Sequence, residues 1–221
     1  MSFAATTNPI LSPLAGSRDT QLGDQGQFFV GLNPTPGTGI ASNATVTAFT
    51  ETTPILVLFN ASNTVSIYPM FLRGHITAAG TGVSTAVNWT FTLDTGNRFT
   101  SGGTPLLVNN INQNSTNLTS AIANYGAVLA TAATGARRIV AHTQVKHTVI
   151  EVIHDTYAFN FGGGYQSSTF PIAANSTTPT YANYSLAPIV IGPLQSLVVV
   201  RWGAAQANAN SAEVEMGWVE K

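Results

Sequence analysis

Apolar and polar residues alternate strictly in VNWTFTL, residues 87–93. Large apolar side chains take every second position, and asparagine or threonine fills the positions between them. Successive side chains of an extended chain point to opposite sides of a sheet. One face therefore holds Val87, Trp89, Phe91 and Leu93, and the other holds Asn88, Thr90 and Thr92. The pattern predicts a half-buried antiparallel strand.

Similar short runs recur along the rest of the chain. Each is rich in Val, Ile, Thr, Phe or Tyr and is bounded by Asn, Gly, Ser or Pro. The runs are TVTAFTETT, ILVLF, VSIYPMFL, PLLV, RIVAHTQV, HTVIEVI, TYAFNF, APIVIG, SLVVVRW and EVEMGWV. Many short strands with turn signals at this spacing predict an all-β fold, an antiparallel β-sandwich with the jelly roll as its expected form.

Three segments depart from this strand pattern. Residues 1–27 contain proline and glycine without a sustained period, which predicts an extended N-terminal arm before a single β-sandwich domain over residues 28–221. Small, helix-compatible residues accumulate in NLTSAIANYGAVLATAATG, residues 117–135, and predict the one short helix. Pro69 interrupts VSIYPMFL, so we expect that strand to lie at a sheet edge or to carry a bulge.

The composition is unusual in its small share of charged residues. Charged residues make up 8% of the chain, against about 25% in an ordinary soluble domain. A chain with so few charges either coats its surface with Thr, Ser, Asn and Gln or covers that surface in permanent contacts. The net charge of −1, with no basic cluster beyond Arg137 and Arg138, argues against a nucleic-acid partner.

Several classes of protein are disfavoured by what the sequence lacks. The chain has no cysteine, which excludes disulfides, thiolate metal sites and thiol nucleophiles. Its N-terminus has neither the basic region nor the continuous apolar stretch of a secretory signal. No apolar run approaches the ~20 residues that span a bilayer as a helix. We therefore expect no membrane partner and no signal peptide.

Three of the four histidines lie in RRIVAHTQVKHTVIEVIHD, residues 137–155. In a helix, His147, Glu151 and His154 would share one face and resemble a non-haem iron or zinc site. In a strand, His154 turns to the face opposite His147 and Glu151, and the three cannot converge on one ion. The β-branched residues of TVIEVI favour the strand. We therefore predict no metal site here, and interpret these residues as polar groups satisfied at a strand end or a subunit contact.

Two carboxylates near the C-terminus have the residue type of a glycosidase pair. Glu213 and Glu215 lie two apart in AEVEMGWVE, where they alternate with Val214, Met216 and Trp218. Alternation explains them as the solvent side of a strand. The sequence thus predicts no catalytic residues, no cofactor-binding residues and no metal ligands, and we expect a protein that is not an enzyme.

The chain contains the stretches LDTGNRFTSGGT (93–104), APIVIGPLQSLVVVRW (187–202) and EVEMGWVEK (213–221). Together with ILVLFNASNTVSIYPMFL (55–72), they resemble a family of virion structural proteins of tailed bacteriophages, the head decoration or cement proteins. The resemblance implies a β-sandwich or jelly-roll subunit, homotrimeric and fixed to the capsid exterior, with no catalytic residues. Its expected partners are the major capsid protein of the same virion and further copies of itself, after synthesis in the host cytoplasm.

The low charge agrees with such a role, because contacts between neutral groups survive salt whereas surface ion pairs are weak and screened. The strand SLVVVRW (196–202) is then the expected inter-subunit contact, and residues 1–27 the expected capsid contact. A positively charged arm that would hold nucleic acid inside a shell is absent, which favours the outside of the capsid.

Two other functions stay open. A receptor-binding or glycan-binding head fibre would use the same sandwich and expose aromatic side chains from the Gly/Ser/Thr/Pro-rich loop of residues 162–188. The contact set would be Tyr165, Phe170, Tyr181 and Tyr184. A cupin-like metal enzyme would bind iron or zinc through His147, although the His-x-His pair of such enzymes is missing from the sequence.

Overall fold

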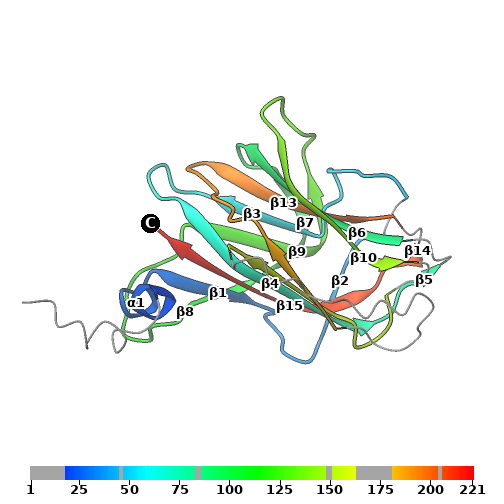
Figure 1. Ribbon diagram of the computed structural model, residues 1–221, viewed down its shortest axis with the longest axis horizontal. Coiled ribbons are helices and arrows are strands. Elements are labelled where there is room, and N and C mark those ends of the chain that lie inside the picture. Colours follow the sequence, from blue (N-terminus) through cyan, green and yellow to red (C-terminus); the bar gives the residue numbers. More distant parts are fainter. Residues whose placement is uncertain (1–17, 45–46, 83–85, 148–150, 163–180, 204–205) are drawn as a thin grey trace, which may run out of the picture.

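The computed structural model describes residues 18–44, 47–82, 86–147, 151–162, 181–203 and 206–221 (Figure 1). Two β-sheets pack face to face, which confirms the predicted all-β sandwich. The jelly-roll form is a finer assignment and stays a prediction. Among the described residues the one helix is α1 (Arg18–Asp24). Nothing helical in this part of the chain has the length and apolar character needed to cross a membrane.

The first sheet, sheet A, is antiparallel except at one edge. Six of its strands run side by side in the order β12 (Tyr181–Leu186), β11 (Thr156–Phe161), β4 (Ile67–Ala78), β15 (Ser211–Glu220), β1 (Phe28–Leu32) and β8 (Leu107–Asn110). A seventh strand, β2 (Ile40–Ala41), pairs with the start of β15. The edge strand β12 runs parallel to β11, so the sheet is mixed rather than wholly antiparallel.

The second sheet, sheet B, is antiparallel throughout. Its order is β10 (Arg138–His147), β6 (Ala86–Thr95), β13 (Gln195–Trp202), β3 (Leu56–Asn60), β9 (Ala121–Ala130) and β7 (Phe99–Pro105). A small separate ribbon pairs β14 (Gln206–Asn208) with β5 (Thr81–Gly82). In Figure 1 the strands of sheet A lie below those of sheet B, and α1 lies at the left beside β1 and β8.

Aromatic side chains fill the space between the sheets. Trp89 of β6 packs on Phe159 of β11 with ring centroids 5.0 Å apart, and Phe91 meets the same ring at 5.1 Å. Trp218 of β15 is fully buried and stacks on Phe29 of β1. The apolar face predicted for VNWTFTL is therefore the core face, and it joins the two sheets.

The central part of the outer face of sheet B is also buried, which the sequence did not predict. Its second apolar cluster consists of Val57, Val128, Ala130, Val198 and Val200, packed against Phe49, Phe99 and Trp202. Because this layer covers β6 and β13, the threonines on the supposed solvent side of β6 are buried as well. The half-buried prediction for VNWTFTL was wrong on that face. The buried hydroxyl of Thr92 is satisfied because it donates a hydrogen bond to the Val198 carbonyl oxygen at 3.2 Å.

Further predictions of local structure were wrong. APIVIG (187–192) is no strand, and Ile191 forms only an isolated bridge with Ile67. The segment 117–135 contains strand β9 rather than a helix, because pairing with β3 on one side and β7 on the other outweighs the weak helix preference of alanine. TVTAFTETT is no strand where the structure describes it, over residues 47–53. These residues form turns and bends, and Phe49 packs on the outer cluster of sheet B.

Pro69 lies at a bulge, the second of the two places expected for it. In the pairing of β4 with β15, Gly217 lies opposite Phe71 and Trp218 lies opposite Pro69. The register therefore shifts by one residue between these two pairs. The ladder between β4 and β11 begins only at Phe71, so no strand pairs with Pro69 on that side. A residue without an N–H group is tolerated there because no ladder bond is required of it.

The N-terminal segment differs from an extended arm where it is described. Residues 18–24 form α1, and Leu22 is buried at 6% exposure. Backbone hydrogen bonds from Gly26 and Gln27 to Gly23 and Leu22 lead the chain into β1. Residues 1–17 of the expected arm lie outside the described residues.

Candidate functional site

A buried ion pair fixes the junction between β6 and β7. Arg98 Nη1 lies 2.6 Å from Asp94 Oδ2, and the two side chains are 1% and 0% exposed. Arg98 also donates from Nε and Nη2 to the Thr131 carbonyl oxygen at 3.0 and 2.6 Å. Asp94 accepts the N–H groups of Thr95 and Thr134 at 2.8 and 2.9 Å. Burial acts to raise the pKa of Asp94, but hydrogen bonds from Thr134 and Thr95 outweigh it and hold the pKa below its ordinary value of 3.8.

A second buried ion pair closes a ring of polar groups from four segments. Arg201 of β13 donates from Nη1 to Glu151 Oε2 at 2.7 Å, and Asn210 Nδ2 donates to the same oxygen at 2.6 Å. Arg201 Nη2 donates to Ser42 Oγ at 2.8 Å, and that hydroxyl donates to Asn210 Oδ1 at 2.6 Å. The ring ties β13 to the segments beside β2, β11 and β15. Glu151 therefore has a structural partner.

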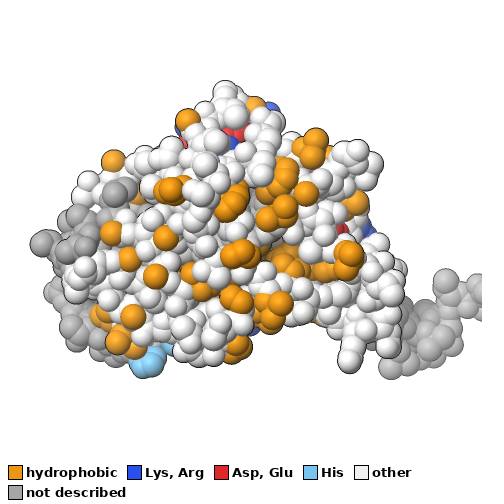
Figure 2. Space-filling view, turned by 180° about the vertical axis from the view of Figure 1, so that it is seen from behind, with side chains coloured by type: hydrophobic (Ala, Val, Ile, Leu, Met, Phe, Trp, Pro, Cys, Tyr) orange, Lys and Arg blue, Asp and Glu red, His pale blue; other side chains and the backbone are white. Residues whose placement is uncertain are grey.

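Burial of charge leaves the surface poorer in ions than the composition suggests. The chain has eight Lys and Arg and nine Asp and Glu. Among those whose burial the structure describes, six are buried: Asp94, Arg98, Glu151, Asp155, Arg201 and Glu220. Figure 2 shows a face on which blue and red atoms are few, and apolar side chains are scattered among uncharged surface.

Two members of the hypothetical metal triad, Glu151 and His154, point in different directions. β10 ends at His147, and residues 151–155 form a turn, so the strand predicted over 147–153 was wrong at residues 151–153. Residues 148–150 lie outside the described residues. The turn is closed by Asp155, whose carboxylate accepts the Val152 N–H at 2.7 Å. It directs Glu151 inward to Arg201 and leaves His154 exposed. Glu151 and His154 therefore do not share a site.

His154 instead meets the one histidine outside the cluster. His75 of β4 and His154 have ring centroids 5.5 Å apart, with His154 Nδ1 at 3.5 Å from His75 Nε2. His75 Nδ1 lies 3.0 Å from the Thr156 hydroxyl. On sheet B, by contrast, the exposed ring of His142 stacks on Trp202 with centroids 5.8 Å apart. No sequence pattern indicates the His75–His154 pair, because the pair depends on the pairing of β4 with β11.

The acidic pair near the C-terminus lies as the alternation predicts. Val214, Met216 and Trp218 of β15 are buried, whereas Glu213 and Glu215 point outward. Glu213 accepts the N–H of Gly37, and Glu215 forms an exposed ion pair with Arg73 at 3.5 Å. Each carboxylate has its own partner, and this strand face is a solvated surface.

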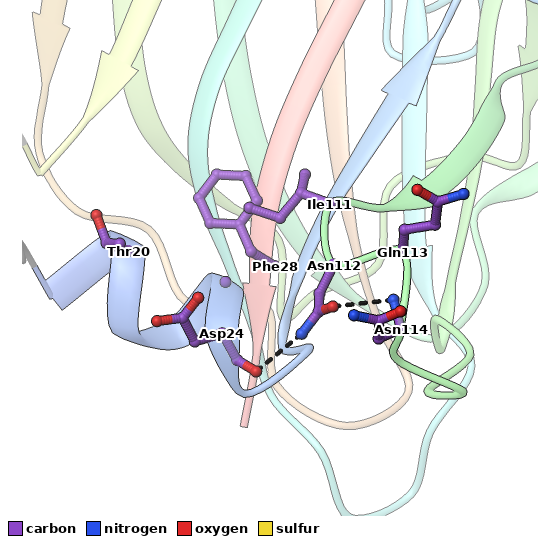
Figure 3. Close-up of a pocket in the computed structure, with 8 residues that line it drawn as sticks. Thr20, Asp24, Phe28, Ile111, Asn112, Gln113 and Asn114 are labelled. Carbon is purple, nitrogen blue, oxygen red and sulfur yellow. Dashed lines mark hydrogen bonds between the residues drawn. The ribbon is translucent and has the colours of Figure 1, made fainter.

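A shallow hollow lies between α1 and the segment after β8 (Figure 3). Its volume is about 620 Å³, and it is lined by Thr20, Gly23, Asp24, Phe28, Ile111, Asn112, Gln113 and Asn114. Asn112 Nδ2 donates to the Asp24 carbonyl oxygen at 2.9 Å, and Asn112 Oδ1 accepts the Asn114 N–H at 3.0 Å. Amide, hydroxyl and carboxylate groups beside Phe28 suit a small polar ligand such as a sugar.

Large aliphatic side chains are exposed on β8 and in the segment that follows it, and one of them, Ile111, lines the hollow. Leu107, Ile111 and Leu118 are 51%, 52% and 89% exposed, and we call them the β8-edge patch. The segment is held against the start of β1, where the Ile111 N–H donates to the Phe28 carbonyl oxygen at 3.2 Å. Exposed aliphatic groups at the edge of a sheet are typical of a surface that contacts another chain.

One strand and one tyrosine that were expected to make contacts are buried. The strand SLVVVRW forms the interior of β13, is buried on both faces and lies between β6 and β3, so its assignment as an inter-subunit contact was wrong. Tyr184 packs in the core at 6% exposure, whereas Tyr181 is 65% exposed. Tyr165 and Phe170 lie outside the described residues.

The buried tyrosines offer no base for catalysis. Burial raises the pKa of Tyr125, Tyr157 and Tyr184 well above the ordinary value of 10. Their hydroxyls therefore stay protonated over the ordinary pH range. Tyr157 lies with its hydroxyl 3.4 Å from Asp155 Oδ2, which makes it part of the turn that carries His154.

No protein family, curated protein or solved structure compared with the chain matches it.

Proposed function

We propose that the chain is a non-enzymatic virion structural protein, a decoration or cement subunit that binds the outside of a phage head as a trimer and stabilises the shell. The observation that supports this most is the distribution of charge. Six charged side chains are buried as structural ties, and the remaining surface is largely neutral. A surface of this kind associates through contacts that salt does not weaken.

The β8-edge patch supports association of the subunit with further copies of itself. Among the strands that the structure describes, β8 pairs with β1 alone, so its other edge can accept contacts from a second chain. In a closed trimer each subunit would bury its patch against a neighbour. The trimer would then bridge copies of the major capsid protein and stabilise the assembled lattice by mass action.

Light scattering on the purified protein tests the trimer. Between about 0.1 and about 1 M salt the Debye length falls from about 10 to about 3 Å, so an association that depends on ion pairs weakens over this range. We expect a trimer at both ends of the range. A stable monomer throughout would overturn the trimer, and a trimer that dissociates in salt would refute the neutral-contact mechanism.

A matched pair of variants locates the contact. Leu107→Asp combined with Leu118→Asp should give a monomer, because it places two carboxylates in the interface. Ile139→Asp on β10 alters a side chain of similar exposure, 53%, on the other sheet and should leave the trimer intact. Co-sedimentation with heads that lack the protein then tests capsid binding, and absence of binding by the trimer would end the decoration hypothesis.

The hollow of Figure 3 favours glycan binding as a second candidate function. Its amide and hydroxyl groups could hydrogen-bond sugar hydroxyls while Phe28 packs against the ring. Binding of the wild-type protein on a glycan array, with loss in a Gln113→Ala variant, would support adhesion. An array without signal would leave the structural role as the better explanation.

A further inference from the structure

We propose that His75 and His154 form a binding site for one divalent late transition-metal ion, with zinc as the reference ion. The two ring nitrogens that face each other, His75 Nε2 and His154 Nδ1, are 3.5 Å apart. Zinc binds histidine nitrogen at about 2.0–2.1 Å, so two such ligands of a tetrahedral ion lie about 3.3–3.4 Å apart. The spacing in the protein is within about 0.2 Å of that requirement.

The hydrogen bonds behind the pair fit the tautomer of His75 that carries its proton on Nδ1. The Thr156 hydroxyl lies 3.4 Å from the His154 carbonyl oxygen, to which it can donate its proton. The Thr156 hydroxyl oxygen then accepts a hydrogen bond from the N–H group at His75 Nδ1, at 3.0 Å. A neutral imidazole protonated at Nδ1 presents a lone pair at Nε2. Fixing one ring nitrogen through a second partner is how metal-binding histidines are commonly oriented.

The backbone holds His154 over His75. His154 has a φ of 72°, in the left-handed region that residues other than glycine rarely adopt. The Ile76 carbonyl oxygen accepts the His154 N–H, and the Ile76 N–H donates to the Asp155 carbonyl oxygen, both at 2.8 Å. The turn is thus bonded to β4 at the residue next to His75, and the two rings do not depend on long flexible chains for their approach.

Water completes the coordination in this site. Glu213 lies opposite His75 across the β4–β15 pairing, but its carboxylate accepts the N–H of Gly37. The described residues contain no set of three or more His, Asp or Glu side chains that could hold an ion. The site therefore offers two protein ligands, and imidazole nitrogen suits zinc, copper and nickel better than magnesium or calcium.

Calorimetric titration of untagged protein with zinc chloride tests the site. We expect one ion per chain. His75→Gln and His154→Asn should each weaken binding at least tenfold, and asparagine is chosen at residue 154 because it tolerates positive φ. Thr156→Val should weaken zinc binding about tenfold, the lower end of the loss known for such second partners. It tests the orientation of His75 without removing a ligand.

Two control variants use the remaining histidines. His142→Gln, on sheet B, and His147→Gln, at the end of β10, should bind zinc as the wild type does. If either control loses the ion while His75→Gln keeps it, the site is elsewhere. No heat from the wild type up to about 1 mM zinc, which corresponds to a binding free energy weaker than about 4.1 kcal/mol, overturns the proposal.

A measurement on the wild-type protein tests the zinc site even if a variant fails to fold. Two-dimensional ¹H–¹⁵N spectra of the imidazole rings report each ring nitrogen separately. Addition of zinc chloride should shift the resonances of His75 Nε2 and His154 Nδ1 and leave those of His142 in place. Unchanged resonances for His75 and His154 at saturating zinc would refute the site whatever the variants do.

Discussion

Replacing Asp94 by asparagine removes the negative charge from a buried ion pair at the connection between β6 and β7. Arg98 is left with its guanidinium at 1% exposure and no counter-charge within the pair. The Thr131 carbonyl oxygen still accepts two of its hydrogen bonds. A buried charge that loses its partner costs about 3–5 kcal/mol. For the pair interaction itself, about 4 kcal/mol follows from two charges 4 Å apart at an effective dielectric constant of 20.

The expected loss is therefore about 3–5 kcal/mol in the free energy of unfolding. In a domain of 150–250 residues each kcal/mol lowers Tm by about 2–4 °C, so Asp94→Asn should lower Tm by about 6–20 °C. Urea unfolding followed by tryptophan fluorescence measures the free energy, and calorimetry measures Tm. Replacing both partners, as Asp94→Leu with Arg98→Met, should recover only part of the loss because Thr134 and Thr131 lose their partners.

Glu215→Gln is the matched control for this prediction. It also removes one carboxylate from an Arg–acid pair, but Arg73 and Glu215 are 54% and 37% exposed and 3.5 Å apart. Exposed pairs contribute about 0–1 kcal/mol, so the control should lose no more than that. If Asp94→Asn loses as little as Glu215→Gln, burial is not what gives the Asp94–Arg98 pair its strength, and the reasoning fails.

Three further predictions concern acid, a glycine and the outer cluster of sheet B. The pKa of Asp94 lies below 3.8 in the folded protein. Its stabilising effect is therefore present above the unfolded pKa and is lost as pH falls through the folded pKa. In acid titrations of unfolding, the difference in free energy of unfolding between the wild type and Asp94→Asn should shrink below about pH 4. Gly126→Ala should lower the free energy of unfolding by at least about 2 kcal/mol. The φ of Gly126 is 103°, and a Cβ atom there would lie 2.5 Å from the Ala41 carbonyl oxygen. Gly135→Ala is the control, because its Cβ meets nothing within 4 Å and its Tm should not change. Phe49→Ala uncovers the outer cluster and should cost about 1–3 kcal/mol in urea unfolding; an unchanged midpoint would show that Phe49 does not cover the cluster.

The alternation of apolar and polar residues correctly predicted two core strands of the fold. VNWTFTL and EVEMGWV have one large apolar side chain at every second position, and the structure places both as core strands. The bulge at Pro69 follows from the missing N–H group. These inferences need only the chemistry of neighbouring residues.

The wrong predictions concern residues whose environment is set by distant segments. Nothing within residues 117–135 indicates that β3 and β7 will pair on either side of β9. Phe49 covers sheet B from a segment that resembles a strand in composition. His75 and His154 are brought together by the pairing of β4 with β11. Contacts across the fold therefore explain both the helix error and the histidine pair that the sequence did not predict.

The placement of charge links the stability of the subunit to its proposed association. The Asp94–Arg98 and Glu151–Arg201 pairs are buried, so salt screens them far less than it screens exposed pairs such as Arg73–Glu215. Added salt should therefore change the folding of the subunit little. A change in molar mass across the salt series would then report on contacts between subunits rather than on unfolding. Measuring Tm in the same buffers makes this separation explicit, because a falling Tm alongside dissociation would assign the effect to the fold instead.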